Sequence, residues 1–538
     1  MIVISQQDFL GANLEIDPKR LGPGFGVSAN NMRPGAANLR PWNGALAVYT
    51  VPGGGAQRLS LYRMGRALAS DVNYWLSWLT DVDVVRSLLA DDTTERIYYT
   101  GDGVPKTTDN VLALATAPYP TAFRTLGVPA PSGVIGLAVL AAGAGTIETR
   151  TYVDTFVTDR GEESAPNPGV PSIAIAATGT VTLSSLPAVP GGSTGITLRR
   201  IYVSSGGEYR QIVQQASNLT TAVDNLARGT VLASGGNLAR PAWLEPPATL
   251  KGLIELWNGM IGGFVGKSLR VCEPYKPHAW PIEYENVVHD DIVGTGKWSQ
   301  NWLVLTTGGP RLFVGSSPLA LNEVPVEFQQ ACVAKRSIVN MGHGVCWASP
   351  DGLAYMGQGG PRILTQDIVS PANWKATFNP ATIVGARLEH FYFCSYVGAD
   401  TLRRSFLIDP LSPQGIITLD PGAFAMFYDT VQDQLYLLGT GNVVNKWDAG
   451  SALTATFKSG LKRVARECNP GVVQVIADTY PVQFTLWGDG TQRHTVAIAN
   501  RDPHRLPGGY MAQDFQVQVS GTTAVQGVLV AEDAQDLQ

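Results

Sequence analysis

The sequence predicts an all-β protein: a β-propeller-like core with an inserted fibronectin III/Ig-like β-sandwich and a C-terminal β-region. Three observations predict this class. Helical periodicity is almost absent, whereas a period-two alternation of apolar and polar residues recurs along the 538 residues. Glycine (59) and proline (35) are abundant and spread along the chain, which predicts many turns. Strand pairs also return roughly every 40 to 45 residues, about the length of one propeller blade.

Residues 1–129 form the predicted N-terminal β-region, which contributes to the propeller. Within it, Ile97–Lys106 has the pattern of a strand followed by a Gly-Asp-Gly turn. The best helical candidates of the whole chain are Ser70–Leu79 and Ala248–Trp257. Each is only two or three turns long and ends against turn residues.

Residues 130–241 have a different character and form the predicted insertion. An Ala/Gly-rich linker from Ala130 to Gly145 leads into the alternating strand Thr151–Val157 and the loop Asp159–Pro166. This strand and loop resemble one end of a fibronectin type III domain, and about 90 residues suffice for such a sandwich. The insertion is expected to close near Pro241–Trp243, because β-units flank it on both sides.

The segment 242–455 contains the other predicted blades, and 456–538 forms a C-terminal β-region. The blade units are 262–271, 306–315, 349–357, 391–409 and 434–442. In the C-terminal region, Val482–Leu486 and Phe515–Val519 alternate strictly, and Gly488–Gly490 predicts a hairpin turn. Two arrangements of this region stay open: it either closes the propeller or forms a separate platform.

Composition and charge exclude several classes of protein. Charged residues make up 15% of the chain, against roughly 25% in an ordinary domain. The 39 basic and 44 acidic residues leave a net charge of −5, which argues against a protein that grips nucleic acid by charge neutralisation. Five cysteines predict reduced, buried thiols. The start of the chain lacks a signal-peptide pattern, and the longest apolar run, Val134–Gly145, is too short to span a membrane.

Residue patterns that would carry enzymatic chemistry or bind a metal are weak. Cys332, His343 and Cys346 have a Cys-x10-His-x2-Cys spacing, but structural zinc sites bring their ligands in close pairs, so core and turn positions are expected for them. His278 lies in a proline-rich aromatic segment and is expected to be part of a rigid packing element. We therefore predict no catalytic residue, no cofactor and no metal site, and no enzymatic activity.

A glycosidase would need two carboxylates, for which the sequence offers Glu273, Glu283, Glu285 and Asp351. Solvated loop positions explain these acids equally well. The glycine-rich stretches 191–195 and 205–207 lie between strands, so they are predicted hairpin turns rather than phosphate loops. The pairs Arg199-Arg200 and Arg403-Arg404 are expected on a solvated sheet face or in subunit salt bridges, rather than against DNA.

Several segments follow one another along the chain in an order typical of one protein family. They are Pro41–Gly44, Gly101–Lys106, Arg199–Tyr202, Leu256–Met260, Cys272–Pro281 and Arg505–Gly509. Together they resemble the tail nozzle proteins of short-tailed bacteriophages, the tail tubular protein B or packaged-DNA stabilisation group. The resemblance spans most of the chain, and Cys272–Pro281 is its most specific segment.

The resemblance implies a virion structural protein, made in the bacterial host cytoplasm, of which six copies form the distal tube of the tail. Each subunit would place a propeller around a central channel for double-stranded DNA, without sequence-specific contact. The partners implied are the tail adaptor ring above the tube and the tail fibres or spikes. The C-terminal β-region, if it does not close the propeller, would form the tail-tip platform.

Two rivals remain at this stage. A receptor-binding or glycan-cleaving phage tail protein would also be β-rich and acidic, although neither long trimeric repeats nor coiled coils are present. A bacterial surface adhesin is opposed by the missing signal-peptide pattern.

Overall fold

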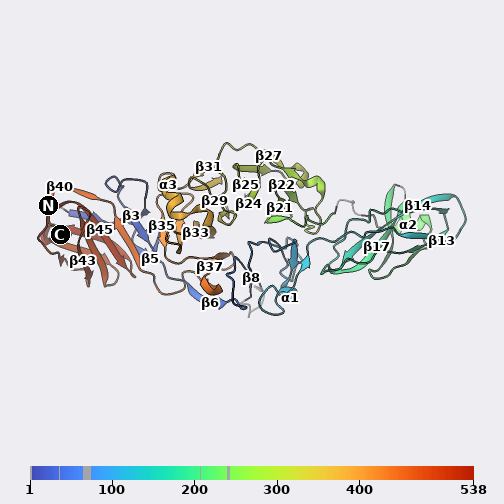
Figure 1. The fold of residues 1–538 in the computed structure, drawn as a ribbon, viewed down its shortest axis with the longest axis horizontal. Coiled ribbons are helices and arrows are strands. Elements are labelled where there is room, and N and C mark those ends of the chain that lie inside the picture. Colours follow the sequence, from blue (N-terminus) through green and yellow to red (C-terminus); the bar gives the residue numbers. More distant parts are fainter. Residues whose placement is uncertain are drawn as a thin grey trace.

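The chain is described by a computed structural model, which covers residues 3–35, 37–64, 74–205, 207–234, 236–238 and 243–537. Three bodies lie in a row along the longest axis (Figure 1). A C-terminal body carrying both chain termini lies at one end, the propeller lies in the middle, and the inserted sandwich lies at the other end. The three are called the C-terminal body, the propeller and the insert below.

The propeller has seven blades in the described residues: five are four-stranded sheets, one has two strands, and the four strands of blade 6 belong to a larger sheet that continues into the C-terminal body. Blade 1 contains β7 (Ser60–Arg63) and β8 (Trp75–Trp78). Blade 2 contains β9 (Asp83–Arg86), β10 (Ile97–Thr100), β11 (Lys106–Thr108) and β12 (Arg124–Thr125), with the short helix α1 (Asn110–Ala113). Blade 3 contains β20 (Lys251–Glu255), β21 (Ile261–Val265), β22 (Ser268–Val271) and β23 (Asn286–Val287).

The other four blades follow in chain order. Blade 4 contains β24 (Ile292–Trp298), β25 (Asn301–Thr306), β26 (Pro310–Val314) and β27 (Asn322–Val324). Blade 5 contains β28 (Val339–Asn340), β29 (Gly344–Ala348), β30 (Leu353–Gly357) and β31 (Gly360–Ile363), followed by α3 (Pro371–Asn373). Blade 6 contains β32 (Val384–Leu388), β33 (Phe391–Val397), β34 (Arg403–Ile408) and β35 (Ile417–Leu419). Blade 7 contains β36 (Ala425–Asp429), β37 (Gln434–Leu438), β38 (Val443–Lys446) and β6 (Leu46–Thr50).

The ring is closed by the N-terminal part of the chain. Strand β6 pairs antiparallel with β38, so blade 7 is assembled from residues almost 400 positions apart. The first strands of successive blades lie against one another from β9 through β20, β24, β28 and β32 to β36, and β36 in turn contacts β7. The strands of residues 456–538 lie outside the seven blades, because β6 supplies the fourth strand of blade 7.

The insert is a two-layered sandwich. One sheet has the order β13 (Gly136–Ala141), β16 (Thr180–Ser184), β19 (Ala222–Asp224). The other has the order β15 (Ser172–Ala176), β14 (Ile147–Thr158), β17 (Ile196–Ser205), β18 (Glu208–Ala216). A short helix, α2 (Arg228–Ser234), follows. Tyr152, Val181 and Ile201 are among the residues of its own apolar core, and its predicted end at Pro241 lies outside the described residues.

The C-terminal body draws strands from both ends of the chain. Its first sheet has the order β1 (Val3–Gln6), β46 (Val525–Ala531), β41 (Val472–Ala477), β44 (His504–Arg505). The second contains β3 (Phe25–Asn30), β39 (Ala455–Ser459), β45 (Ala512–Gly521), β42 (Val482–Gly488) and β43 (Thr491–Ile498), with β2 (Gly11–Ala12) and β40 (Lys462–Cys468) at its sides. The small ribbon β4 (Met32–Arg33) and β5 (Arg40–Pro41) follows β3. The expected region 1–129 is therefore divided between this body and the propeller.

Both helical candidates are wrong wherever the structure describes them. Residues 251–255 form strand β20 and residues 75–78 form strand β8, while 70–73 lie outside the described residues. Trp75 and Leu76 are buried between neighbouring sheets, and such packing overrides a weak local preference for helix. Among the described residues, no helix is long and apolar enough to cross a membrane.

Candidate functional site: the junction between the insert and the propeller

The insert leaves the propeller after blade 2 and the chain returns to it before blade 3. The two connecting segments lie side by side, since a Cβ placed on Gly127 would be only 3.1 Å from the Cα of Glu245. Gly127 has φ = 96°, which glycine adopts freely, so this close approach needs a glycine. The insert is thus attached at one place, which we call the insert junction.

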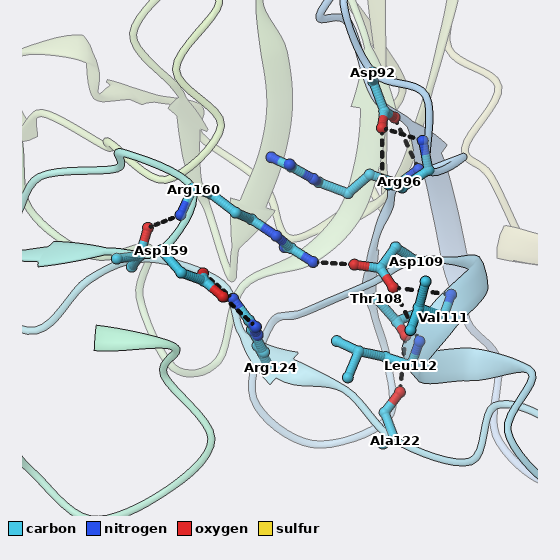
Figure 2. Close-up of polar contacts among 12 residues, drawn as sticks. Asp92, Arg96, Thr108, Asp109, Val111, Leu112, Ala122, Arg124, Asp159 and Arg160 are labelled. Carbon is cyan, nitrogen blue, oxygen red and sulfur yellow. Dashed lines mark hydrogen bonds and ion pairs between the residues drawn. The ribbon is translucent and has the colours of Figure 1, made fainter. Parts of the chain in front are cut away.

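Three ion pairs cross the insert junction, and Figure 2 shows two of them. Arg124 at the end of blade 2 binds both carboxylate oxygens of Asp159 in the insert, at 2.5 and 2.8 Å. The Arg160 guanidinium donates to Asp109 in blade 2. The third pair joins Arg96 Nη1 and Glu162 Oε1 at 3.3 Å. These ion pairs and one backbone hydrogen bond, from the N–H of Thr125 to the carbonyl of Ser193 at 3.0 Å, connect the two bodies, which share no sheet in the described residues.

Two acids of the junction, Asp159 and Glu162, have altered pKa values. The hydrogen bond from Arg124 is the main reason why the pKa of Asp159 lies below its ordinary value. Burial raises the pKa of Glu162, although Arg96 and Arg160 oppose the change. Asp109 also caps helix α1, because its side chain accepts hydrogen bonds from the backbone N–H groups of Val111 and Leu112.

A cavity of about 300 Å³ adjoins these pairs. Its walls come from the loop after β9, from residues 160–162 of the insert, and from Tyr275, Pro277 and His278 before blade 3's last strand. His278 is 8% exposed, and its ring meets that of Trp243 edge-on at 5.9 Å. Burial, and then the nearby cations Lys276 and Arg96, lower the pKa of His278 to about 4, so the imidazole is neutral at pH 7.

The axis of the propeller is spanned by two basic side chains that precede blade 5. Lys335 Nζ lies 2.7 Å from Asp83 and 3.0 Å from Asp81, across the ring at blade 2. Arg336 donates to the carbonyl oxygens of Leu59 before blade 1 and Phe424 before blade 7. Burial alone would lower the pKa of Lys335, but Asp83 and Asp81 outweigh it and raise the pKa, so the ammonium keeps its charge. These contacts join blades on opposite sides of the ring.

The Cys332, His343 and Cys346 trio is not gathered into a metal site. Cys332 Sγ donates to the carbonyl of Ala334, and His343 Nδ1 is 2.8 Å from the hydroxyl of Tyr355. Cys332 and Cys346 belong to different apolar clusters, and burial raises the pKa of the Cys332 thiol to about 12. No group of three His, Cys, Asp or Glu side chains in the described part of the chain is placed to hold a metal ion.

Three of the four carboxylates weighed for glycoside hydrolysis are engaged in structural contacts. Glu273 accepts a hydrogen bond from Tyr284, and Glu285 pairs with Arg270 at 2.9 Å. Glu283 lies in the short turn before β23 and is exposed. Asp351 sits in the β29–β30 turn, where it binds Gln330 and Lys375.

The arginine pairs have different environments. Arg199 is fully buried in the insert, 3.2 Å from Asp154, with its guanidinium 5.0 Å from the ring centre of Phe156. The expectation of a solvated face or a subunit salt bridge is therefore wrong for Arg199, because its partner lies in the core of its own sandwich. Arg200 pairs with Glu163 at 2.7 Å, Arg404 binds Asp400, and Arg403 lies over the ring of Phe424.

Sequence reasoning did not anticipate the insert junction. The sequence pattern indicates only a turn at Asp159, Arg160 and Glu162, and no local pattern singles out Arg96, Arg124 or Asp109. A signal did exist, because charged residues are scarce in this chain and the Asp159–Glu163 stretch concentrates four of them beside an exposed loop. Which partners they meet depends on the fold.

Comparisons with known proteins identify no family for the chain. No family model matches, and no curated protein matches. Among solved structures, apo AztD from Citrobacter koseri is similar with a TM-score of 0.27 at 12% identity, over 70% of this chain and 100% of that chain. BamB from Moraxella catarrhalis gives 0.25 at 11%, over 68% and 98%. The WD40 domain of Toxoplasma gondii coronin gives 0.25 at 8%, over 73% and 88%. At these values the likenesses assign no function.

Proposed function

We propose that the protein is a non-enzymatic structural subunit of the tail nozzle of a short-tailed bacteriophage. Copies of the chain, six by resemblance to the nozzle family, would form a ring below the tail adaptor. The ring would hold packaged DNA in the virion and pass it during ejection. Tail fibres or spikes would attach around it.

The observation that carries this proposal is the end-to-end arrangement of three β-bodies, of which two share one continuous sheet. Strand β35 of blade 6 pairs with β3 of the C-terminal body at Thr418 and Asn30. A long subunit with a fixed connection between two of its bodies suits the wall of a tube that bears load during ejection.

The contacts across the propeller axis support one path for DNA in this proposal. Because Lys335 and Arg336 span the ring, the conduit in this proposal lies between copies of the chain and not through one propeller. The excess of 44 acidic over 39 basic residues supports a lumen with a weak hold on DNA. A lumen rich in Lys and Arg would bind phosphates and slow ejection.

Cryo-electron microscopy of the virion tail tests the proposal. We expect a closed ring of this chain under the adaptor, with neutral or acidic side chains toward the DNA. The purified protein can be monomeric, so native mass spectrometry is done with and without the adaptor protein. Location in the capsid shell or in peripheral fibres, or a channel lined mainly by Lys and Arg, would refute the proposal.

A further inference from the structure

The cavity at the insert junction is built from both bodies. Asp91, Asp92 and Arg96 come from the loop of blade 2, Arg160 and Glu162 come from the insert, and 275–278 come from blade 3. Its volume of about 300 Å³ is at the lower end of the range for small-molecule pockets. A ligand there would contact three separate segments of the chain at once.

The lining has hydrogen-bonding capacity that the protein itself leaves unused. Among the described residues that line the cavity, His278 Nε2 and Arg160 Nη1 are buried nitrogen atoms without a hydrogen-bond partner. His278 is more than nine-tenths buried, and an unpaired polar group in such a place costs stability. Carboxylate oxygens of Asp91 and Glu162 add acceptors to the same lining. Donors and acceptors are therefore mixed in one small space.

Charge in the cavity disfavours an anionic ligand. The lining has three acids, Asp91, Asp92 and Glu162, and only two cations, Arg96 and Arg160. Arg96 pairs with Glu162 and Arg160 pairs with Asp109, so neither guanidinium is available as an uncompensated charge for an anion. The oxygens of Asp92 accept hydrogen bonds from the backbone N–H groups of Thr94 and Arg96. In the described part of the chain, no set of three side chains is arranged for a metal ion. A neutral ligand fits best.

Tyr275 adds an apolar surface at the rim. Its side chain is 56% exposed although it is a large aromatic residue, and its backbone has φ = 59°. The N–H of Tyr275 donates to the carbonyl of Gly259 at 2.8 Å, and a Cβ on Gly259 would lie 2.7 Å from the Tyr275 ring. The contact with Gly259 thus holds the ring in this exposed position. An exposed aromatic face beside mixed donors and acceptors suits a ring that is apolar on one face and hydroxylated at its edge.

We infer that the insert-junction cavity binds a neutral carbohydrate, one pyranose unit of a glycan. The sugar hydroxyls would bond to Glu162, Arg160 and His278, and the C–H face of the ring would stack on Tyr275. Every hydroxyl group both donates and accepts, which matches the mixed lining. The inference does not rest on the nozzle proposal, because ring assembly and sugar binding are measured separately.

Saturation-transfer NMR on the full chain tests the inference. The probes are D-glucose, D-galactose, N-acetyl-D-glucosamine and L-rhamnose, each up to about 20 mM, with sodium phosphate and D-glucuronate as anionic probes. We expect at least one neutral sugar to bind with a Kd of about 1 mM. Tyr275→Ala should weaken it at least roughly tenfold, whereas Tyr275→Phe, which keeps the ring, should retain it.

Two further variants separate the cavity from general effects on the fold. Glu162→Gln removes a charged acceptor and should also weaken sugar binding. Met511→Ala changes a side chain of the C-terminal body that is likewise 56% exposed, and should leave binding unchanged. Thermal melting confirms that each variant is folded. The inference is overturned if no neutral sugar binds, if Tyr275→Ala binds as well as the parent, or if phosphate binds in preference to every neutral sugar.

Discussion

The propeller is joined to its two neighbours in opposite ways. At the C-terminal junction the two bodies share a hydrogen-bonded sheet, and one apolar cluster runs through both, including Phe393 and Leu437 of the propeller and Val475 and Phe515 of the C-terminal body. At the insert junction the contacts described above are ion pairs around a cavity, and the insert has an apolar core of its own.

The two sets of contacts differ in how easily solution conditions can break them. Apolar burial depends little on salt or pH. The apolar contacts between the propeller and the C-terminal body cannot be broken without unfolding both bodies. Ion pairs at a surface weaken with salt and with protonation of the acids. We therefore expect the propeller and the C-terminal body to unfold as one unit, and the insert to behave as a separate one.

The largest expected effect comes from Trp447→Ala at the C-terminal junction. Trp447 is 1% exposed and packs against Trp42 of the N-terminal segment and Phe393 of blade 6, with ring centres 5.8 and 5.5 Å away. Removing it should lower the free energy of unfolding by about 3–5 kcal/mol, measured by urea unfolding. The control Val431→Ala, at a side chain that is 72% exposed, should change it by less than about 0.5 kcal/mol. A loss confined to the transition of the insert would contradict the shared core.

The second prediction concerns pH and His278 at the insert junction. The unfolded chain binds a proton at this imidazole below its ordinary pKa of 6.5, whereas the folded chain does so only below about 4. The contribution of the neutral His278 imidazole to the free energy of unfolding is therefore complete above pH 6.5. It is lost as the pH falls to 4, by at most about 3 kcal/mol. Glu162 has a raised pKa and acts in the opposite direction, so the parent alone does not isolate the effect.

Comparison with His278→Phe isolates the contribution of the imidazole. The stability difference between the parent and this variant should shift against the parent between pH 7 and pH 4, followed by urea unfolding at each pH. A difference that does not vary over this range would mean that the imidazole is solvated in the folded protein.

A smaller effect is expected from Arg160→Ala. The side chains of Arg160 and Asp109 are 11% and 10% exposed, and loss of the arginine leaves a mostly buried carboxylate on blade 2 without its cation. Docking of the insert should weaken by roughly 1–3 kcal/mol, seen as faster hydrogen exchange in residues 91–96 and 159–163 while the core of the insert stays protected. High salt should raise the hydrogen-exchange rates of the parent toward those of the variant. Arg404→Ala, which breaks an exposed ion pair with Asp400, is the matched control and should leave this exchange unchanged.

The two junctions also differ in how far the sequence could predict them. Alternation in Val482–Leu486 and Phe515–Val519 predicted strands β42 and β45, because side-chain periodicity is a local property. No local pattern indicates that β1 pairs with β46, or that β6 closes blade 7. Those pairings depend on which strand edges lie together in the folded chain, although hundreds of residues separate them in the sequence. The same holds for Arg96 and Glu162, which are 66 positions apart and meet only because the insert folds back on blade 2.

The smallest effect on the propeller is expected from removing the insert altogether. Joining Ala130 to Trp243 through a short Gly/Ser linker is geometrically easy, since the neighbouring residues Gly127 and Glu245 are already in close approach. Arg96, Arg124 and Asp109 would lose their partners but gain water, and Asp109 would keep its hydrogen bonds to the start of helix α1. The unfolding free energy of the remaining protein should therefore change by less than about 1 kcal/mol.

The matched excision at the other junction is deletion of residues 456–538. It removes the partner of β1 and exposes the shared apolar cluster, so it should yield insoluble protein. Equal outcomes for the two deletions would show that the junctions do not differ in the way their contacts imply.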